Sequence, residues 1–258
     1  NERVAQLTKI LGEQHREIST AVLPTGEIQI AVAGELKIDD ELPEGLVEGV
    51  KIVEGPERLT NDEALEGGVQ VYATGGGQCT SGFSVRSIFT GTEGISTAAH
   101  CFGINRFSQA GPDPVLVHAG EHNGAFGDME WKTSAEDAVD NYWAGPGDYR
   151  DVGSVWGAGS FATNMVTCVH SRMQAQRSCD QIYSTSVSST VNGITASNLV
   201  ATDNDNTVGG DSGGPWSYGS IADGIHKGDK WIWFGTRNVF SKADLLPAAL
   251  GVAVMTTP

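Results

Sequence analysis

Short strand-like runs separated by turn residues fill the chain from Val69 onward, and they restrict its fold class more than any other feature. Examples are residues 82–89, 114–118, 165–170 and 182–187, with Gly, Asn, Asp and Ser between them. This pattern is typical of antiparallel sheets joined by turns. The 34 glycines and the charged fraction of 19% agree with it. The sequence therefore predicts a mostly β fold, with one helix over Ser241–Leu250 that Ser241 can cap.

The first 66 residues differ in character from the rest. They carry 15 Asp and Glu against 6 Lys and Arg, a net charge of −9, and no cysteine. Apolar residues recur at helical spacing through the first 18 residues, and strand-like runs follow at 27–32 and 50–53. We therefore expect a small α/β unit over residues 1–66 and a boundary near Gly67.

The charge and hydropathy of the chain argue against several classes of partner. The formal net charge is −16, and clustered Lys and Arg for phosphate contacts are lacking. No apolar run reaches the length of about 18 residues that a membrane-spanning helix needs. We expect a soluble protein with no nucleic-acid partner and no membrane partner.

Four cysteines, Cys79, Cys101, Cys168 and Cys179, form an even set without the C-x-x-C spacing of zinc or redox sites. Such a set favours two disulfides in an oxidising compartment, and four cysteines allow three pairings.

A serine lies among small residues in the run Gly210-Asp211-Ser212-Gly213-Gly214-Pro215. There the backbone can bend tightly and a carbonyl can approach the hydroxyl without obstruction. The N–H groups of Gly210 and Ser212 can point at one position and stabilise an oxyanion. Taken alone, however, such a run is more often a glycine-rich turn without chemistry.

A histidine lies beside a cysteine in the run Ser96-Thr97-Ala98-Ala99-His100-Cys101. Alone, it is more often a packed or solvated histidine. With the serine run it supplies the second half of a nucleophile and general-base pair.

Together the two runs resemble the histidine and serine signatures of the chymotrypsin-like serine proteases. The similarity is closer to the bacterial secreted branch, the streptogrisin and α-lytic group, through Cys79-Thr80-Ser81-Gly82-Phe83 and Gly224-Ile225-His226-Lys227-Gly228. The resemblance covers about residues 67–258. It implies two six-stranded antiparallel Greek-key β-barrels, at about 69–145 and 150–258, with a C-terminal helix. It also implies a secreted, extracellular serine endopeptidase.

The resemblance assigns roles to individual residues. Ser212 is the expected nucleophile and His100 the general base, and an aspartate between them in sequence orients the histidine. Asp128 matches the place of that aspartate, while Asp148 and Asp151 are alternatives. Gly210 and Ser212 are expected to form the oxyanion hole, and Asp211 to be structural. The implied disulfides are Cys79–Cys101 and Cys168–Cys179.

The substrate-binding part departs from the family in two ways. The usual cysteine before the serine and its downstream partner are both missing, so the bridge that braces the specificity pocket is absent. Lys227 stands where relatives often have a small hydroxyl residue. We expect a looser pocket with Asn206 near its base, and substrate-backbone pairing by Lys227, Gly228 and Asp229; the preferred residue before the scissile bond stays open.

The acidic first segment is similar in size and element order to the pro-segments of secreted bacterial relatives. The resemblance implies an intramolecular pro-segment, cleavage between about Ala64 and Gly67, and an unprocessed precursor here. An accessory domain that is retained for stability is the alternative. We expect a monomer.

Two other functions stay open at this level. One is a catalytically inactive, protease-like binding protein, which Lys227 and the lost pocket bridge favour. The other is an esterase that uses the same triad on small acyl groups. We expect protein or peptide substrates and no metal or organic cofactor, because His118, His122, His170 and His226 lack the spacing of metal ligands.

Overall fold

The computed structural model of the chain describes residues 18–22, 28–32, 50–54, 64–109, 113–232 and 235–257. Residue contacts divide the chain into two units, Asn1–Asn61 and Asp62–Pro258. In the described part, no helix is both long enough and apolar enough to span a membrane.

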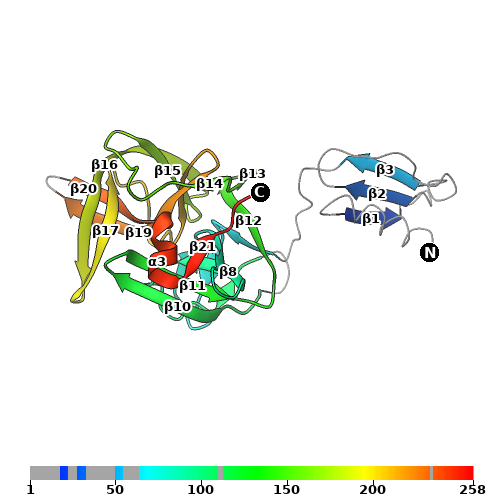
Figure 1. Cartoon of the computed structure of the whole chain (residues 1–258), viewed down its shortest axis with the longest axis horizontal. Helices are drawn as coiled ribbons and strands as arrows, with labels where there is room; N and C mark the ends of the chain where they lie inside the picture. The colour runs from blue at the N-terminus through cyan, green and yellow to red at the C-terminus, as the bar shows by residue number, and fades with distance from the viewer. Residues whose placement is uncertain are drawn as a thin grey trace. The chain divides into compact units, whose positions relative to one another are not determined.

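The first unit contains a three-stranded sheet (Figure 1). Strand β1 (Ile18–Val22) pairs antiparallel with β2 (Ile28–Val32), and β3 (Val50–Glu54) pairs parallel with β2. The strands predicted at 27–32 and 50–53 are confirmed. Ile18 begins a strand instead of extending the predicted helix, and the rest of that helix lies outside the described residues.

Strand β4 (Leu65–Gly67) belongs to the second unit, although we expected the boundary near Gly67. It pairs in parallel with β12 (Ala138–Gly145), and Leu65 is fully buried. Cleavage between Ala64 and Gly67 would cut this buried strand. The division after Asn61 lies before it and leaves the strand whole.

The second unit is almost entirely β-structure. Its remaining strands before the serine are β5 (Gln70–Tyr72), β6 (Gln78–Thr80), β7 (Ser84–Ser87), β8 (Glu93–Thr97), β9 (Arg106–Phe107), β10 (Val117–Gly124), β11 (Gly127–Thr133), β13 (Asp148–Asp151), β14 (Ser154–Val155), β15 (Val166–Ser171), β16 (Gln176–Val191) and β17 (Ile194–Thr202). After the serine come β18 (Pro215–Tyr218), β19 (Ile221–Ile232), β20 (Gly235–Lys242) and β21 (Val252–Val254).

These strands form two curled sheet systems. The N-terminal system joins a five-stranded sheet, β10-β11-β8-β7-β21, with the three-stranded sheets β6-β5-β9 and β13-β12-β4. The C-terminal system has the order β14-β19-β18-β15-β16-β17-β20, and β20 also pairs with β19. That last pairing closes six strands into a barrel, which removes their exposed edges. The fold is the predicted chymotrypsin-like, two-barrel type.

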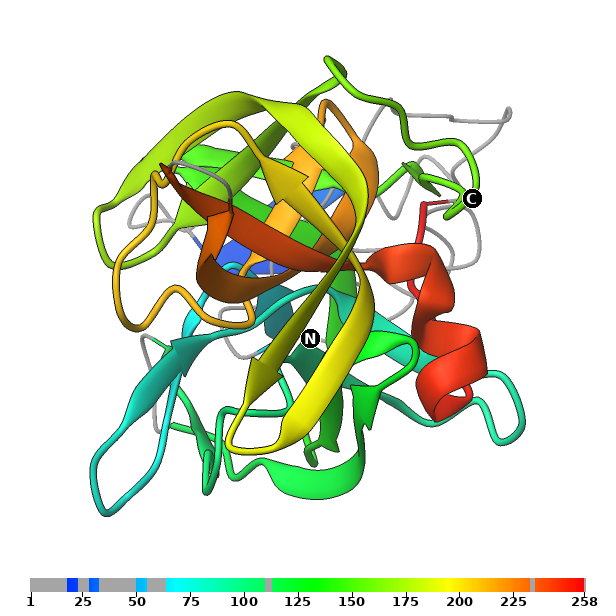
Figure 2. The same cartoon turned by 90° about the vertical axis from the view of Figure 1, so that its left-hand side faces the viewer.

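The end of the chain differs from the predicted barrel limits and helix. Strand β21 pairs with β7 of the N-terminal system, so that system is completed by residues from the C-terminus. The predicted helix over Ser241–Leu250 is shorter, because Ser241 and Lys242 still belong to β20. A 3₁₀ turn η1 (Ala243–Leu245) leads into α3 (Leu246–Leu250), which packs on β10 and β11 (Figure 2).

Candidate active site

A tight turn after β8 carries His100. Ala98 and Ala99 are buried, and the N–H of Cys101 donates to the carbonyl of Ala98 at 3.0 Å. The disulfide Cys79–Cys101 ties this turn to β6, and Cys168–Cys179 joins β15 to β16. Both expected disulfides are therefore present, and the first one fixes the backbone next to His100.

Asp128 is fully buried near the start of β11. Its backbone N–H donates to Oγ of Ser241 at 2.9 Å. The preceding Gly127 has φ 113° and passes so close to Ser241 that an added Cβ would lie 2.7 Å from Oγ. Glycine is required here both for its backbone angle and for the close approach.

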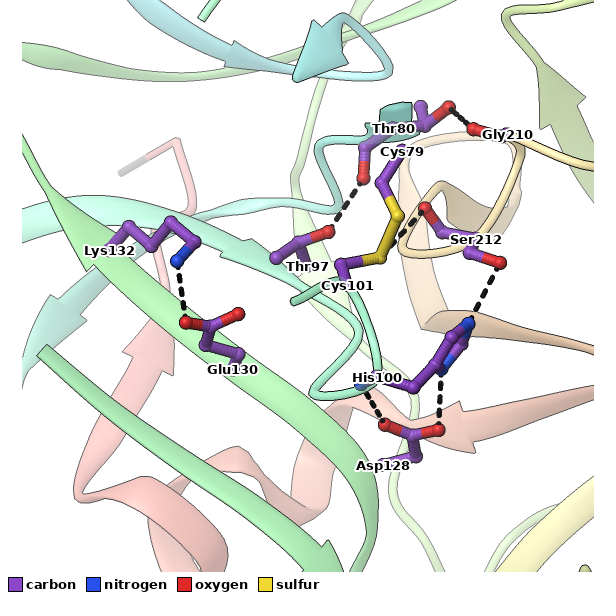
Figure 3. Close-up of a disulfide and its surroundings, with 10 residues drawn as sticks. All are labelled: Cys79, Thr80, Thr97, His100, Cys101, Asp128, Glu130, Lys132, Gly210 and Ser212. Atoms are coloured by element: carbon purple, nitrogen blue, oxygen red, sulfur yellow. Dashed lines mark hydrogen bonds and ion pairs between the residues drawn. A yellow bond between two sulfur atoms is a disulfide. The ribbon is translucent and has the colours of Figure 1, made fainter. Parts of the chain in front are cut away.

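Asp128, His100 and Ser212 form one hydrogen-bonded chain (Figure 3). Oδ2 of Asp128 lies 2.7 Å from Nδ1 of His100, and Oδ1 accepts the backbone N–H of His100 at 3.1 Å. Nε2 of His100 lies 2.9 Å from Oγ of Ser212. The carboxylate thus holds His100 at its ring Nδ1 and at its backbone N–H, and orients Nε2 toward the serine.

The carboxyl group of Asp128 is ionised by its surroundings. Burial acts to raise its pKa, but the hydrogen bond and charge of His100 and the ammonium of Lys227 outweigh that effect. The pKa of Asp128 therefore lies below its ordinary value. Of the two alternatives, Asp148 binds Arg150 at 2.6 Å, and Asp151 lies in β13, whereas the two ring nitrogens of His100 contact Asp128 and Ser212.

The loop that carries Ser212 is fixed by β6 and β19. The N–H of Thr80 donates to the carbonyl of Ser212 and the Thr80 hydroxyl donates to that of Gly210, each at 2.8 Å. Gly213 has φ 87°, and a Cβ there would lie 2.1 Å from Oγ1 of Thr97. Within the described residues, the N–H groups of Gly210 and Ser212 have no acceptor, so both are available to an oxyanion.

Asp211 is fully buried beside the serine and points away from the histidine. Oδ2 accepts the hydroxyl of Ser171 at 2.7 Å and the N–H of Val208 at 3.0 Å. Oδ1 accepts the N–H of Met173 at 3.2 Å. These contacts brace the loop with groups from within the chain, as expected for a structural residue.

The segment that contains Asn206 is braced by Asn238 of β20, whose side chain is fully buried. In the amide orientation that satisfies its neighbours, the Asn238 nitrogen donates to Asp205 at 3.0 Å and to Thr207 at 2.8 Å. Its oxygen accepts the N–H of Asn206 at 2.9 Å. Hydrogen bonds from Asn238 thus hold the segment around Asn206, where we expected a looser pocket because a family disulfide is missing.

Lys227 lies at a shift of register between β19 and β20, where His226 pairs with Phe240 and Gly228 with Val239. Lys227 is buried, and its Nζ donates to Oδ2 of Asp128. The side chain therefore lies against Asp128. Gly228 and the exposed Asp229 continue the same strand.

The other histidines have separate environments. His226 is buried, its Nδ1 accepts the indole N–H of Trp216 at 3.2 Å, and burial lowers its pKa to about 3. Burial likewise lowers the pKa of His170 to about 4, and its ring contacts the carbonyl of Ala144 and the hydroxyl of Ser217. Both rings are neutral at ordinary pH.

His118 belongs to a group with Glu121 and Glu130, whose potential ligand atoms lie within 4.8 Å of one another. The spacing in sequence gave no sign of this group. Nζ of Lys132, itself buried, donates to Oε1 of Glu130 at 2.5 Å, and Nδ1 of His118 lies 2.7 Å from the same oxygen (Figure 3 shows the Lys132 contact). The ammonium thereby balances the buried carboxylate from within the chain.

Sequence reasoning missed three features of the site. Ser241 was assigned to a helix cap but binds the backbone of Asp128, and Asn238 carried no signal at all. For Lys227 the sequence predicts pairing with the substrate backbone and a side chain that either points away or perturbs the triad. It does not predict the specific contact with Asp128, which depends on the shifted register of β19.

Comparisons with known proteins gave matches among solved structures. No protein-family model matches the chain, and no curated protein matches it. Among solved structures, Thermobifida fusca protease A is 27% identical, with 75% of this chain and 100% of that chain covered and a TM-score of 0.60. A glutamic acid specific serine protease that uses a histidine triad in substrate binding is 21% identical, with 74% and 100% covered and a TM-score of 0.60. Cellulomonas bogoriensis chymotrypsin is also 21% identical, with 75% and 100% covered and a TM-score of 0.59.

The described fold and the likeness to Thermobifida fusca protease A agree with the two sequence signatures. The chain has the fold of the chymotrypsin-like serine proteases, and its likeness to Thermobifida fusca protease A together with the two signatures supports a serine endopeptidase.

Proposed function

We propose that this protein is a secreted endopeptidase that hydrolyses peptide bonds through an acyl-enzyme on Ser212. The observation that carries the proposal is the chain of contacts from Asp128 through His100 to Ser212, at 2.7 and 2.9 Å. Asp128 is fully buried and His100 is partly exposed, so the charge is shielded while the base remains reachable.

In the proposed reaction, Oγ of Ser212 forms a bond to the substrate carbonyl carbon as its proton moves to Nε2 of His100. The carbonyl π electrons move to the oxygen, which the N–H groups of Gly210 and Ser212 stabilise. The imidazolium then gives its proton to the leaving nitrogen as the C–N bond breaks. A water molecule repeats the sequence on the acyl-enzyme and releases the acid. Asp128 keeps the Nδ1 proton in place throughout.

Substrate would pair with the backbone of Lys227, Gly228 and Asp229, and its residue before the scissile bond would lie near Asn206. The wall around Asn206 is held by Asn238, which favours a formed pocket over a collapsed one. The partner is accordingly a protein or a peptide.

The proposal of secretion rests on the two disulfides, which persist in oxidising compartments. We further propose that residues 1–61 form an intramolecular pro-segment. Because Asp211 is satisfied by Ser171, Val208 and Met173, the oxyanion loop needs no new N-terminal amine to form. N-terminal sequencing of active material tests this. A new N-terminus between Asn61 and Leu65 supports the proposal, and an intact Asn1 refutes it.

The test of the proposed activity is cleavage of an internally quenched peptide library by the purified chain and by Ser212→Ala. Cleavage inside the peptides that is lost in Ser212→Ala supports the proposal. Turnover of acyl esters with no peptide cleavage at matched leaving groups would favour an esterase. Absence of both activities would favour an inactive binding protein.

A further inference from the structure

Lys227 shares the triad carboxylate with His100. Its Nζ donates to Oδ2 of Asp128, the same oxygen that lies 2.7 Å from Nδ1 of His100. The lysine side chain is 8% exposed and the aspartate side chain 0%. The triad of this protein is therefore a four-membered cluster with an ammonium group in direct contact.

The ammonium changes the charge balance of the cluster. With a neutral His100, Asp128 alone would leave the cluster at −1, and Lys227 brings it to zero. Protonation of His100 then brings it to +1 instead of to zero. The carboxylate and the ammonium are buried and the imidazole is 33% exposed, so solvent screens the repulsion between Lys227 and a protonated His100 only in part. Lys227 therefore disfavours the imidazolium.

No other described group around the cluster offsets this effect. From β19, His226 is buried and neutral, and from β10, His122 accepts the N–H of Phe126 at 3.1 Å. Strand β20 supplies only the neutral hydroxyl of Ser241. The carboxylate of Asp211, next to the serine, accepts hydrogen bonds from Ser171 and Val208 and makes none to the cluster among the described residues. Asp229, two residues beyond Lys227, is exposed to solvent.

We propose that Lys227 is an electrostatic positioning residue of the triad, whose ammonium keeps Asp128 ionised and opposes the protonation of His100. The site then keeps its unprotonated base to lower pH than a triad without the lysine. The same charge makes His100 a weaker base toward Ser212. Activity therefore extends to lower pH, and kcat is lower. The kinetic part of this inference rests on the proposed function, whereas the protonation part does not.

The direct test is the pKa of His100, measured by NMR of histidine-labelled full-length chain that carries Ser212→Ala. Adding Lys227→Met removes the ammonium and keeps a chain of similar size. We expect the His100 titration to move up by about one pH unit or more. Lys242→Met is the matched control, because Lys242 is another buried lysine on the adjacent β20, and its Nζ lies over the ring of Phe161 instead of the triad. It should leave His100 unchanged.

An unmoved His100 titration in folded Lys227→Met would overturn the proposal whether or not the protein cleaves peptides. If Lys227→Met does not fold, Lys227→Ser replaces it, because the serine hydroxyl can donate to Asp128 without a charge; the same upward shift is expected.

In the active chain, the acid limb of log kcat/KM should move up by the same amount in Lys227→Met or Lys227→Ser. A fall in kcat with no movement of that limb would indicate a merely structural role and would contradict the proposal. Loss of peptide cleavage in the unmodified chain, with the NMR shift intact, would refute the proposed function alone.

Discussion

Nε2 of His100 lies 2.9 Å from Oγ of Ser212, although 112 positions separate the two residues in the sequence. The histidine follows β8 of the N-terminal sheet system, and the serine precedes β18 of the C-terminal barrel. The contact therefore exists only when both systems are folded and docked. Bonds from Thr80 to the serine loop hold that docking in place.

The buried carboxylate of Asp128 can be tested by the substitution Asp128→Asn. An amide of the same shape keeps the packing but cannot hold the Nδ1 proton in the required tautomer. We expect a loss of about 10⁴-fold in kcat in a chain that still folds. The melting temperature should fall, because the buried ammonium of Lys227 loses its charged partner. Near-normal turnover by the folded variant would exclude Asp128 as the orienting residue. Asp151→Asn, at the remaining alternative position, should have little effect.

The Asn238 side chain holds the segment around Asn206 by hydrogen bonds, and Asn238→Ala removes these bonds. The N–H of Asn206 and the hydroxyl of Thr207 then lose a partner, each worth about 1 kcal/mol. We expect KM for peptide substrates to rise about tenfold, with a smaller effect on kcat. Thr190→Val is the control, because that hydroxyl bonds to Thr195 on an exposed hairpin. An unchanged KM in Asn238→Ala would show that the wall is held by other means.

Removing each disulfide in turn should distinguish an effect on stability from an effect on activity. Their sequence separations of 22 and 11 residues predict similar losses, about 3 kcal/mol each, when both cysteines of a pair become alanine. Only Cys79–Cys101 adjoins His100, so its removal should also lower kcat. Denaturant unfolding and kinetics of both double variants measure this. Equal kcat losses in the two variants would argue against a special role for the first bridge.

Asp223 should make stability depend on pH. The side chain is 4% exposed, and burial raises its pKa to about 7, against a lowering effect of the Thr167 hydroxyl. Because the unfolded chain gives up this proton near pH 4 while the folded chain keeps it, stability from Asp223 is lost as pH rises from about 4 to 7. The melting temperature of Asp223→Asn minus that of the parent should therefore be larger at pH 8 than at pH 4. A pH-independent difference would contradict the raised pKa.

His100 and Ser212 could be proposed from two local runs taken together, although neither run alone indicates catalysis. Asp128 could be placed only through the family resemblance, since its run has no chemical signature of its own. The contact of Lys227 depends on the register shift beside Gly228, and the bracing by Asn238 joins segments about 30 positions apart. Such long-range relationships cannot be deduced from composition or spacing. The same holds for β21, which completes the N-terminal sheet from the far end of the chain.

The most direct test of the central claim is labelling of the full-length chain with a biotinylated fluorophosphonate, followed by mapping of the modified residue. The Ser212→Ala variant is the matched control. The account predicts covalent labelling at Ser212, abolished in Ser212→Ala and strongly reduced in Asp128→Asn, because only an activated serine attacks the phosphorus. Failure of the folded chain to label, both intact and after removal of residues 1–61 by limited proteolysis, would contradict it.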